Sequence, residues 1–340
     1  MKNTINRWRA TWNPDMYHGW GKTHRYFEGW YFKIVDNTEG YALAFIPGIS
    51  YSQSGEAHAF IQVLDGKQLR TAYHRFDVAD FKPDDQQFSL QIADNQFSTN
   101  SIKLNLPDIQ GELFFKNPTP WVKMLGAPGI MGWYSFVPLM ECYHGIVSLD
   151  HSIEGSLTIE GKTVDFTNGR GYIEKDWGIS FPRGWFWMQS NHFFEKNPQN
   201  TEGVSPDAKG VSLIASVAHI PFLGTYFIGY IVGFWFKNKL HRFATYTGAK
   251  MQARLDGNHI QLRFKDNRYL LEIEATKAGT GNLVSPLQGE MTGKVSESLQ
   301  AILNVRFFDN NTLVFEGQGR NAGLEAAGNI EELLTNEWRR

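Results

Sequence analysis

The sequence predicts an all-β protein made of two tandem antiparallel β-barrels or closed sandwiches. Short runs rich in Val, Ile, Phe and Tyr recur along the chain, turn pairs such as Asp65-Gly66 and Asp256-Gly257 separate many of them, and helical periodicity is scarce. Many consecutive hairpins favour a closed sheet, because closure removes unpaired edges. A chain of 340 residues also exceeds the usual size of one core, which favours two domains.

The clearest strand predictions lie in the first third of the chain. They cover residues 27–35, 41–46, 57–64, 88–92, 102–106 and 112–115. The uncharged segment 220–236 is short for a membrane span and is interrupted by Pro and Gly, so it predicts two adjoining buried strands. Residues 330–334 predict a short terminal helix. The Pro- and Gly-rich segment 117–138 predicts a lid or a loop that lines a cavity.

Four short sequence motifs (called words below) recur in the same order and indicate an internal duplication. HRF occurs at 74–76 and 241–243, and GWYF at 29–32 resembles GWFW at 184–187. IQGEL at 109–113 resembles LQGEM at 287–291, and a Gly-Arg pair precedes a second glycine by the same distance at 169–178 and 319–328. Two copies, about 27–178 and 183–328, predict modules 1–180 and 181–340, the second ending in the short helix.

The segment 171–178, GYIEKDWG, combines two acids and a lysine with large aromatic residues. Buried charges are costly unless they are paired, so this segment is either a surface turn or a reactive site. The repeat alignment matches Glu174 with Leu324 and Asp176 with Ala326. The acids are therefore present in only one of the two copies, which favours a role beyond folding. The alternative is that Glu174 and Lys175 form a solvated or salt-bridged pair. Glu28 is expected to pair with Arg25 or Lys33.

Composition narrows the range of functions. A net charge of −2 gives no reason to expect a nucleic-acid partner. The single Cys142 excludes an intrachain disulfide and fits a reducing compartment. The N-terminus lacks the apolar run of a signal peptide and nothing resembles a transit peptide, so a cytoplasmic location is expected. The 25 Phe, 13 Tyr and 11 Trp residues exceed the needs of a core and suggest a cavity for an apolar ligand.

Other catalytic motifs are missing from the sequence. There is no His-Glu-x-x-His or Gly-x-Ser-x-Gly, and the ten histidines approach metal-ligand spacing only loosely, at His144 and His151. These motifs therefore give no reason to expect a metal site or a serine hydrolase.

The chain resembles the tocopherol cyclase family. The resemblance is carried by FEGWYFK at 27–33, SFVP at 135–138 with ECYHG at 141–145, YIEKDWG at 172–178 with WxQxN at 187–191, LEIEAT at 271–276 and AGLE at 322–325. More distantly, segment 171–178 is similar to a signature of carotenoid hydratase-like proteins. Those proteins have tandem lipocalin-like barrels, so the resemblance implies two lipocalin-like modules here.

The resemblance implies acid-initiated chemistry on an isoprenoid. A cyclase of this kind protonates a prenyl double bond, and a phenol oxygen of the quinol then closes the ring without a cofactor. Such chemistry needs a carboxylic acid whose pKa is raised by apolar surroundings. Glu174 is the expected proton donor and Asp176 its partner or base. The expected substrate-binding residues are Trp30, His144, Tyr172, Trp177, Trp185, Trp187, Gln189 and Asn191.

Each of these expectations has an alternative. The protein could instead be a non-catalytic carrier of a hydrophobic or isoprenoid ligand, or a hydratase in which water captures the cation. Trp30 and Trp185 could pack the barrel floors, and His144 could be a satisfied buried histidine. A lipid-like substrate also implies transient contact with a membrane. The sequence leaves the oligomeric state and the ligand's identity open.

Overall fold

The computed structural model describes residues 2–138, 140–196, 210–222 and 224–335. Its contacts divide the chain into two units. The first contains Met1–Phe181 and Asn282–Val295, and the second contains Pro182–Gly281 and Ser296–Arg340. The predicted modules, 1–180 and 181–340, assign residues 282–295 to the second module, whereas their contacts group them with the first. The predicted second module also includes residues 336–340, which lie outside the described residues.

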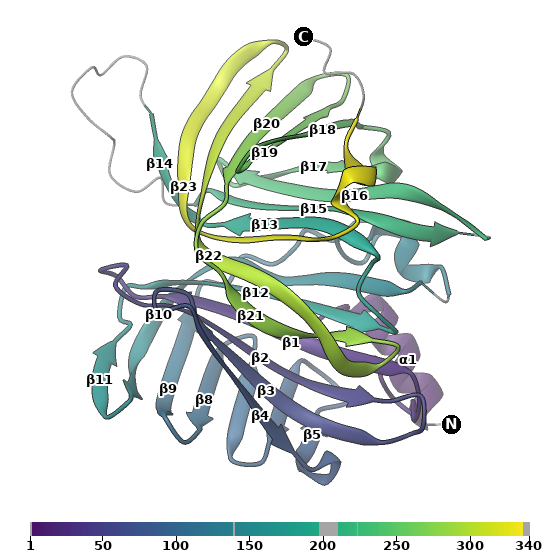
Figure 1. The fold of residues 1–340 in the computed structure, drawn as a ribbon, viewed down its shortest axis with the longest axis vertical. Helices are drawn as coiled ribbons and strands as arrows, with labels where there is room; N and C mark the ends of the chain where they lie inside the picture. Colours follow the sequence, from purple (N-terminus) through teal and green to yellow (C-terminus); the bar gives the residue numbers. More distant parts are fainter. Residues whose placement is uncertain (1, 139, 197–209, 223, 336–340) are drawn as a thin grey trace. The chain divides into compact units, whose positions relative to one another are not determined.

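Each unit is dominated by one large antiparallel sheet, as the all-β prediction requires (Figure 1). The strands up to the first boundary are β1 Tyr26–Val35, β2 Ala42–Tyr51, β3 Ala57–Asp65, β4 Arg70–Phe76, β5 Phe81–Pro83, β6 Ser89–Ile92, β7 Asn95–Ser98, β8 Ser101–Asn105, β9 Ile109–Lys116, β10 Cys142–Ile159, β11 Lys162–Asp165 and β12 Arg170–Gly178. All six segments predicted as strands in this part of the chain overlap one of them.

The remaining strands continue the hairpin pattern. They are β13 Gly184–Ser190, β14 His192–Glu195, β15 Ser212–Phe222, β16 Thr225–Phe236, β17 Lys239–Ala244, β18 Lys250–Asp256, β19 His259–Lys265, β20 Tyr269–Thr276, β21 Gly281–Leu287, β22 Glu290–Asp309 and β23 Thr312–Gly328. The segment 220–236 contributes to β15 and β16, which pair with each other, as predicted. The prediction that both strands are buried is wrong at the turn between them, where Phe222 and Tyr226 are exposed. Within the described residues, no helix combines the length and the apolar character needed to cross a membrane.

The helices are few. An α-helix, α1, spans Lys2–Trp12, and short 3₁₀ turns cover Val78–Asp80, Gly132–Phe136, Thr245–Thr247 and Ile330–Leu333. The last of these corresponds to the predicted terminal helix. Sequence analysis missed α1 because apolar residues are few among its eleven residues and give only a weak helical pattern.

The two sheets share one strand order, which is the strongest sign of duplication. In the first, β4-β3-β2-β1-β12-β10-β9-β8 are neighbours, and in the second β17-β16-β15-β13-β23-β22-β20-β19 follow the same path. The full sheets end at β5 and at β18. In both units the two end strands, β4 and β5 in the first and β17 and β18 in the second, are joined in sequence by a short link that contains a 3₁₀ turn. Each sheet therefore curls around its own apolar core, one containing Phe32 and Phe97 and the other Phe234 and Phe307.

Three of the four repeated words fall on equivalent strands. The HRF words lie on β4 and β17, the GW words on β1 and β13, and the glycine words on β12 and β23. Gly178 and Gly328 end their strands with φ of +153° and +68°, and a Cβ at either would collide with a carbonyl oxygen. The fourth match is wrong: 109–113 lies on β9, but 287–291 lies where β21 turns into β22.

The alignment of Glu174 with Leu324 is also wrong at the level of side chains. On β12, Ile173 and Trp177 face the core of the first unit, so Glu174 faces outward. On β23, Ala322 and Leu324 belong to the core of the second unit. A shift of one residue reverses the face of every side chain in a strand, so matching words do not ensure matching positions.

Candidate active site

Strand β12 has different polar side chains on its two faces. Tyr172, Glu174 and Asp176 share the outer face, while Lys175 lies inward beside the aromatic core of the first unit. The strand pairs with β1 on one side and with β10 on the other, so each face also receives groups from those neighbours. Sequence neighbours such as Glu174 and Lys175 are therefore separated by the sheet itself.

The outer face holds a compact cluster centred on His144. His144 lies directly opposite Asp176 in the β10–β12 register, and its Nδ1 is 2.8 Å from Asp176 Oδ1. Its Nε2 is 3.3 Å from Glu174 Oε2. The Tyr172 hydroxyl donates a hydrogen bond to the same Glu174 oxygen. One imidazole thus bridges two carboxylates, one of which also accepts a phenolic hydrogen bond.

The electrostatics of the cluster favour a proton on His144. Burial of the ring lowers its pKa, but the charges of Asp176 and Glu174 outweigh that effect and raise the pKa of His144 to about 10. Burial and the neighbouring Glu174 raise the pKa of the Tyr172 phenol, which stays protonated. The thiol of Cys142 has a raised pKa through burial and the charge of Asp176. At neutral pH the cluster holds an imidazolium that is hydrogen-bonded to Asp176 through Nδ1 and faces Glu174 through Nε2.

The same three residues could also ligate a divalent metal. His144, Glu174 and Asp176 each offer one ligand atom, and these atoms lie within 4.8 Å of one another. One imidazole and two carboxylates form a plausible partial ligand set. A metal would have to displace the proton from His144, because only neutral imidazole binds metal. Spacing between histidines could not indicate this group, since its members come from two strands.

The inner face of the same strand carries a buried ion pair. Lys175 donates hydrogen bonds to a Glu28 carboxylate oxygen and to the Met16 carbonyl. The Glu28 carboxylate oxygens also accept from the single backbone N–H of His18, at 2.9 and 3.0 Å, and one of them accepts from the Tyr26 hydroxyl at 2.5 Å. The expected pairing of Glu28 with Arg25 or Lys33 is therefore wrong. The expected pairing of Glu174 with Lys175 is wrong as well.

The surroundings of this pair explain how the charges are tolerated. Burial opposes ionisation of Glu28, but Lys175 and His18 outweigh it and lower the Glu28 pKa. Burial lowers the pKa of Lys175 and, together with the Lys175 charge, lowers that of His18 to about 4. The Lys175 ammonium also lies 4.5 Å from the Trp30 ring centre and 4.8 Å from that of Trp177. The pair attaches the backbone around residues 16–19 to the sheet.

The aromatic residues that were expected to bind the substrate lie in different places. Trp30 stacks on Phe88 at 5.2 Å and donates its indole N–H to the Asp15 carbonyl, within the core of the first unit. Trp177 stacks on His18 at 4.0 Å. Both rings lie on the inner face of the sheet, away from Glu174. The structure thus brings Tyr172 and His144, but not these two tryptophans, to the predicted acids.

The other predicted residues belong to β13 and its end, in the second unit. Trp187 and Gln189 alternate there with Phe186 and Met188, which face the core, so they lie on the outer face of their own sheet. Trp185 shares that face and donates its indole N–H to Glu325 at 2.6 Å. Gln189 is fully buried, and within the described part of the chain neither its amide nitrogen nor its oxygen has a hydrogen-bond partner. Asn191, also buried, lies 2.9 Å from the ring nitrogen of His192.

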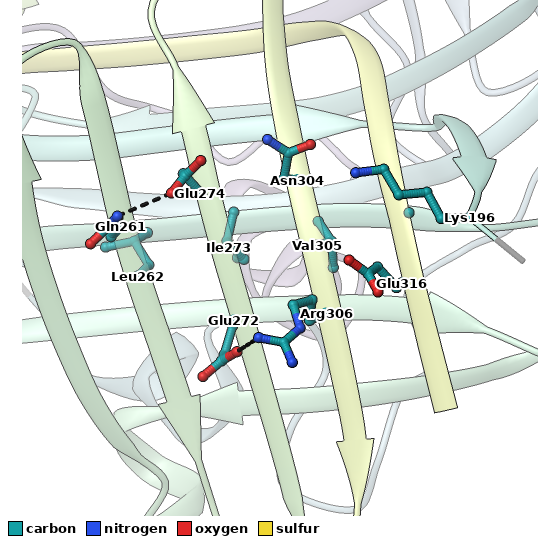
Figure 2. A pocket seen from close by; sticks show the side chains of 11 residues that line it. Lys196, Gln261, Leu262, Glu272, Ile273, Glu274, Asn304, Val305, Arg306 and Glu316 are labelled. Carbon is teal, nitrogen blue, oxygen red and sulfur yellow. Dashed lines mark hydrogen bonds and ion pairs between the residues drawn. The ribbon is translucent and has the colours of Figure 1, made fainter. Parts of the chain in front are cut away.

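A separate hollow of 460 Å³ lies on the second unit, with charged and amide side chains as well as apolar groups in its lining (Figure 2). Leu262, Ile273 and Val305 belong to the core, so the residues that alternate with them line the hollow from the outer face. Figure 2 shows Arg306 beside Glu272 and Gln261 beside Glu274, with contacts of 3.2 and 3.0 Å. None of the predicted site residues lines it.

The fold and the His144 cluster together define a tandem β-barrel protein with an acid–imidazole site. The family model described as tocopherol cyclase-like matches residues 120–328, and the chain belongs to that family. The matched region includes His144, Glu174 and Asp176 but not Glu28 or helix α1.

Curated relatives come from plants. The chain is 23% identical over 205 residues to the probable chloroplastic tocopherol cyclase of Oryza sativa subsp. japonica, covering 58% of this chain and 42% of the relative. It is 26% identical over 277 residues to the chloroplastic tocopherol cyclase of Zea mays, covering 80% of this chain and 52% of the relative. The chain thus spans about half the length of these relatives.

Two solved structures are similar at low identity. A putative AttH from Nitrosomonas europaea aligns with a TM-score of 0.47 and 11% identity over 88% of this chain and 92% of that chain. Kievitone hydratase from Nectria haematococca aligns with a TM-score of 0.43 and 10% identity over 89% of each chain.

Proposed function

We propose that this protein is an acid-initiated cyclase that acts on a prenyl double bond of a prenylated quinol or a related isoprenoid, without a cofactor. The observation that carries the proposal is the bridging position of His144 between Glu174 and Asp176. Membership of the tocopherol cyclase-like family supports the reaction class. The cluster supplies what such a reaction needs, which is a proton held in a buried place and a base nearby to receive one.

Glu174 is the proposed proton donor and His144 the proton reservoir. An imidazolium with a pKa of about 10 is a weak acid, so direct transfer from His144 to an alkene is unfavourable. An apolar chain that covers Glu174 removes water from it and favours its neutral form. The proton then moves from His144 Nε2 to Glu174 Oε2, which are 3.3 Å apart.

The ring-closing step follows with all atoms balanced. The carboxylic acid of Glu174 gives its proton to the less substituted alkene carbon and leaves a tertiary carbocation. The phenol oxygen attacks that cation, a C–O bond forms, and the phenolic proton passes to the cluster. Asp176 holds His144 in position through its 2.8 Å contact, and Tyr172 supports the Glu174 carboxylate between turnovers. The site returns to its starting protonation.

The deciding experiment replaces Glu174 by Gln. Turnover of a prenylated methylbenzoquinol dispersed in detergent is followed by chromatography and mass spectrometry of the chromanol product. Glu174→Gln is expected to lower kcat by about 10²- to 10⁴-fold, the usual contribution of a general acid, with quinol affinity unchanged. Glu325→Gln on β23 is the matched control and should retain kcat. Full activity of the Glu174→Gln variant would remove Glu174 from the mechanism.

One observation favours a second candidate, a non-catalytic carrier. Gln189 is fully buried with an amide that lacks a partner among the described residues, and such a group is usually satisfied by water or by a ligand. A carrier needs recognition of this kind but no proton transfer. Tight binding of the quinol by the wild-type protein, with no chromanol formed, would favour the carrier over the cyclase.

A further inference from the structure

Helix α1 exposes its apolar face and buries polar and small residues. Ile5, Trp8 and Trp12 follow the i, i+3, i+7 spacing of one helix face and are 49%, 68% and 40% exposed. Asn6 and Ala10, on the opposite face, are buried. The hydrophobic effect favours the reverse orientation in a helix that has only water outside. This arrangement indicates that the outward face meets an apolar environment.

The segment 117–138 extends this face. The Lys123 ammonium donates hydrogen bonds to the Trp12 carbonyl at 3.1 Å and to Asn13 Oδ1 at 3.0 Å, and the rings of Trp12 and Phe136 lie 5.1 Å apart. A tight turn between Met124 and Ala127 carries Leu125 at its tip, fully exposed. The segment predicted as a lid or cavity loop thus presents apolar side chains to the exterior beside α1.

The concentration of apolar residues here is local. Among the described residues, eight of the fifteen large hydrophobic side chains that are exposed lie in residues 2–13 or 117–138. Exposed apolar residues scattered singly need no explanation, but a contiguous group of this size indicates an interaction surface. We name residues 2–13 and 117–138 the apolar face.

The charge of the apolar face selects its partner. The two segments contain Lys2, Arg7, Arg9 and Lys123 and no Asp or Glu. Lys2 forms a 3.0 Å ion pair with Asp85, which lies outside the segments. Two copies meeting in a two-fold dimer would bring this positive surface against itself. An anionic lipid surface is instead complementary to it, and tryptophan is enriched where proteins meet the headgroup region.

We propose that the apolar face docks the first unit on the surface of an anionic bilayer, with Trp8 and Trp12 at headgroup level and Leu125 inserted below them. The inference rests on the proposed function in one respect: a bilayer is where a prenylated quinol resides, so docking supplies the substrate. The docking itself requires no catalysis and is tested without substrate.

The test is flotation with vesicles of phosphatidylcholine, alone or mixed with phosphatidylglycerol. The wild-type protein should bind the mixed vesicles about tenfold or more tightly than the neutral ones, and added salt should reduce the difference. The double variant Trp8→Ser/Leu125→Ser should bind about tenfold or more weakly, because it loses two side chains that enter the apolar layer. Phe114→Ser/Leu313→Ser removes two other exposed apolar residues and should bind like the wild type.

Three outcomes would overturn the docking surface. They are absence of vesicle binding by the wild type, unchanged binding by Trp8→Ser/Leu125→Ser with an unchanged thermal midpoint, and self-association that this variant abolishes without any vesicle binding. Failure of the proposed function gives a different pattern: no turnover of detergent-dispersed quinol, with vesicle binding intact. If docking alone fails, turnover in detergent persists.

Discussion

Strands β12 and β23 occupy the same place in their sheets but carry different chemistry. Strand β12 lies between β1 and β10, and β23 lies between β13 and β22. The inner face of β12 holds the Lys175–Glu28 pair, whereas the inner face of β23 holds Ala322 and Leu324. On the outer face, β12 presents two carboxylates to His144, and β23 presents Glu325 to the Trp185 indole.

The difference shows which charges the fold itself requires. The second unit closes its sheet around an apolar core, and its described residues include no group of one imidazole with two carboxylates like that on β12. Burying charges costs free energy that well-packed apolar groups do not cost. We therefore propose a chemical role for the cluster on β12. The inner pair has a structural explanation, because it attaches residues 16–19 to the sheet.

The largest expected effect comes from a substitution on the outer face of the first sheet. His144→Gln removes the proton reservoir, and we expect kcat on detergent-dispersed quinol to fall by about 10²- to 10⁴-fold. His241→Gln in the second unit is the matched control, because burial lowers the pKa of His241 to about 4 and no proton is stored there. Equal kcat losses in both variants would argue that His144 has only a structural role.

The next largest effect is a loss of stability caused by a substitution on the inner face of the same sheet. Lys175→Met leaves Glu28 buried without its ionic partner, and we expect a loss of about 3–5 kcal/mol in the free energy of unfolding. The measurement is urea denaturation followed by tryptophan fluorescence. The double variant Glu28→Gln/Lys175→Met should recover part of the loss. A Lys175→Met protein as stable as the wild type would show that this pair contributes little to the fold.

A smaller effect appears in the pH dependence of stability. The pKa of His144 is raised to about 10 in the folded protein, above the usual value of about 6.5, so its contribution is complete below pH 6.5 and is lost as the pH rises through 10. We expect the thermal midpoint of the wild type to fall more steeply over this interval than that of His144→Gln. Parallel curves would show that the folded protein does not hold a proton on His144.

The smallest expected effect is that of metal removal. Chelation with EDTA should leave kcat unchanged, since a metal at Glu174 and Asp176 would need neutral His144. The measurement is turnover of detergent-dispersed quinol before and after dialysis against chelator. Loss of activity that Mn²⁺ or Zn²⁺ restores would show that the site works with a bound metal and not with an imidazolium. Strands β12 and β23 would then differ in metal binding.

Sequence patterns predicted most of the strands but not the way the side chains meet. Alternation and turn residues identified β1–β3, β6, β8 and β9, because these signals are local. The prediction failed for the pairing of Glu28, because its partner lies 147 residues away and reaches it only through the β1–β12 register. The alignment with Leu324 failed for a related reason: words of sequence repeat without preserving the face of the strand.

The candidate site was found in part. The segment 171–178 drew attention through acids among aromatic residues, and family resemblance gave those acids a reaction. What the residues alone did not indicate is that His144 bridges them, because it lies on β10, 32 residues before Asp176. Trp30 and Trp177 were expected to lie beside the two acids, but they lie on the other face of the sheet. Neighbouring positions in a strand face opposite ways, so closeness in sequence did not bring them together.

By itself, the sequence determined an all-β chain, a tandem architecture, membership of a family and the segment that carries the acids. These follow from short-range patterns of polarity, turns and motif words, which survive without knowledge of the fold. Tertiary structure alone decided that Glu174 meets His144 while Lys175 meets Glu28. The physical reason is that a strand alternates its side chains between two faces, and only the register with neighbouring strands determines which distant groups share each face.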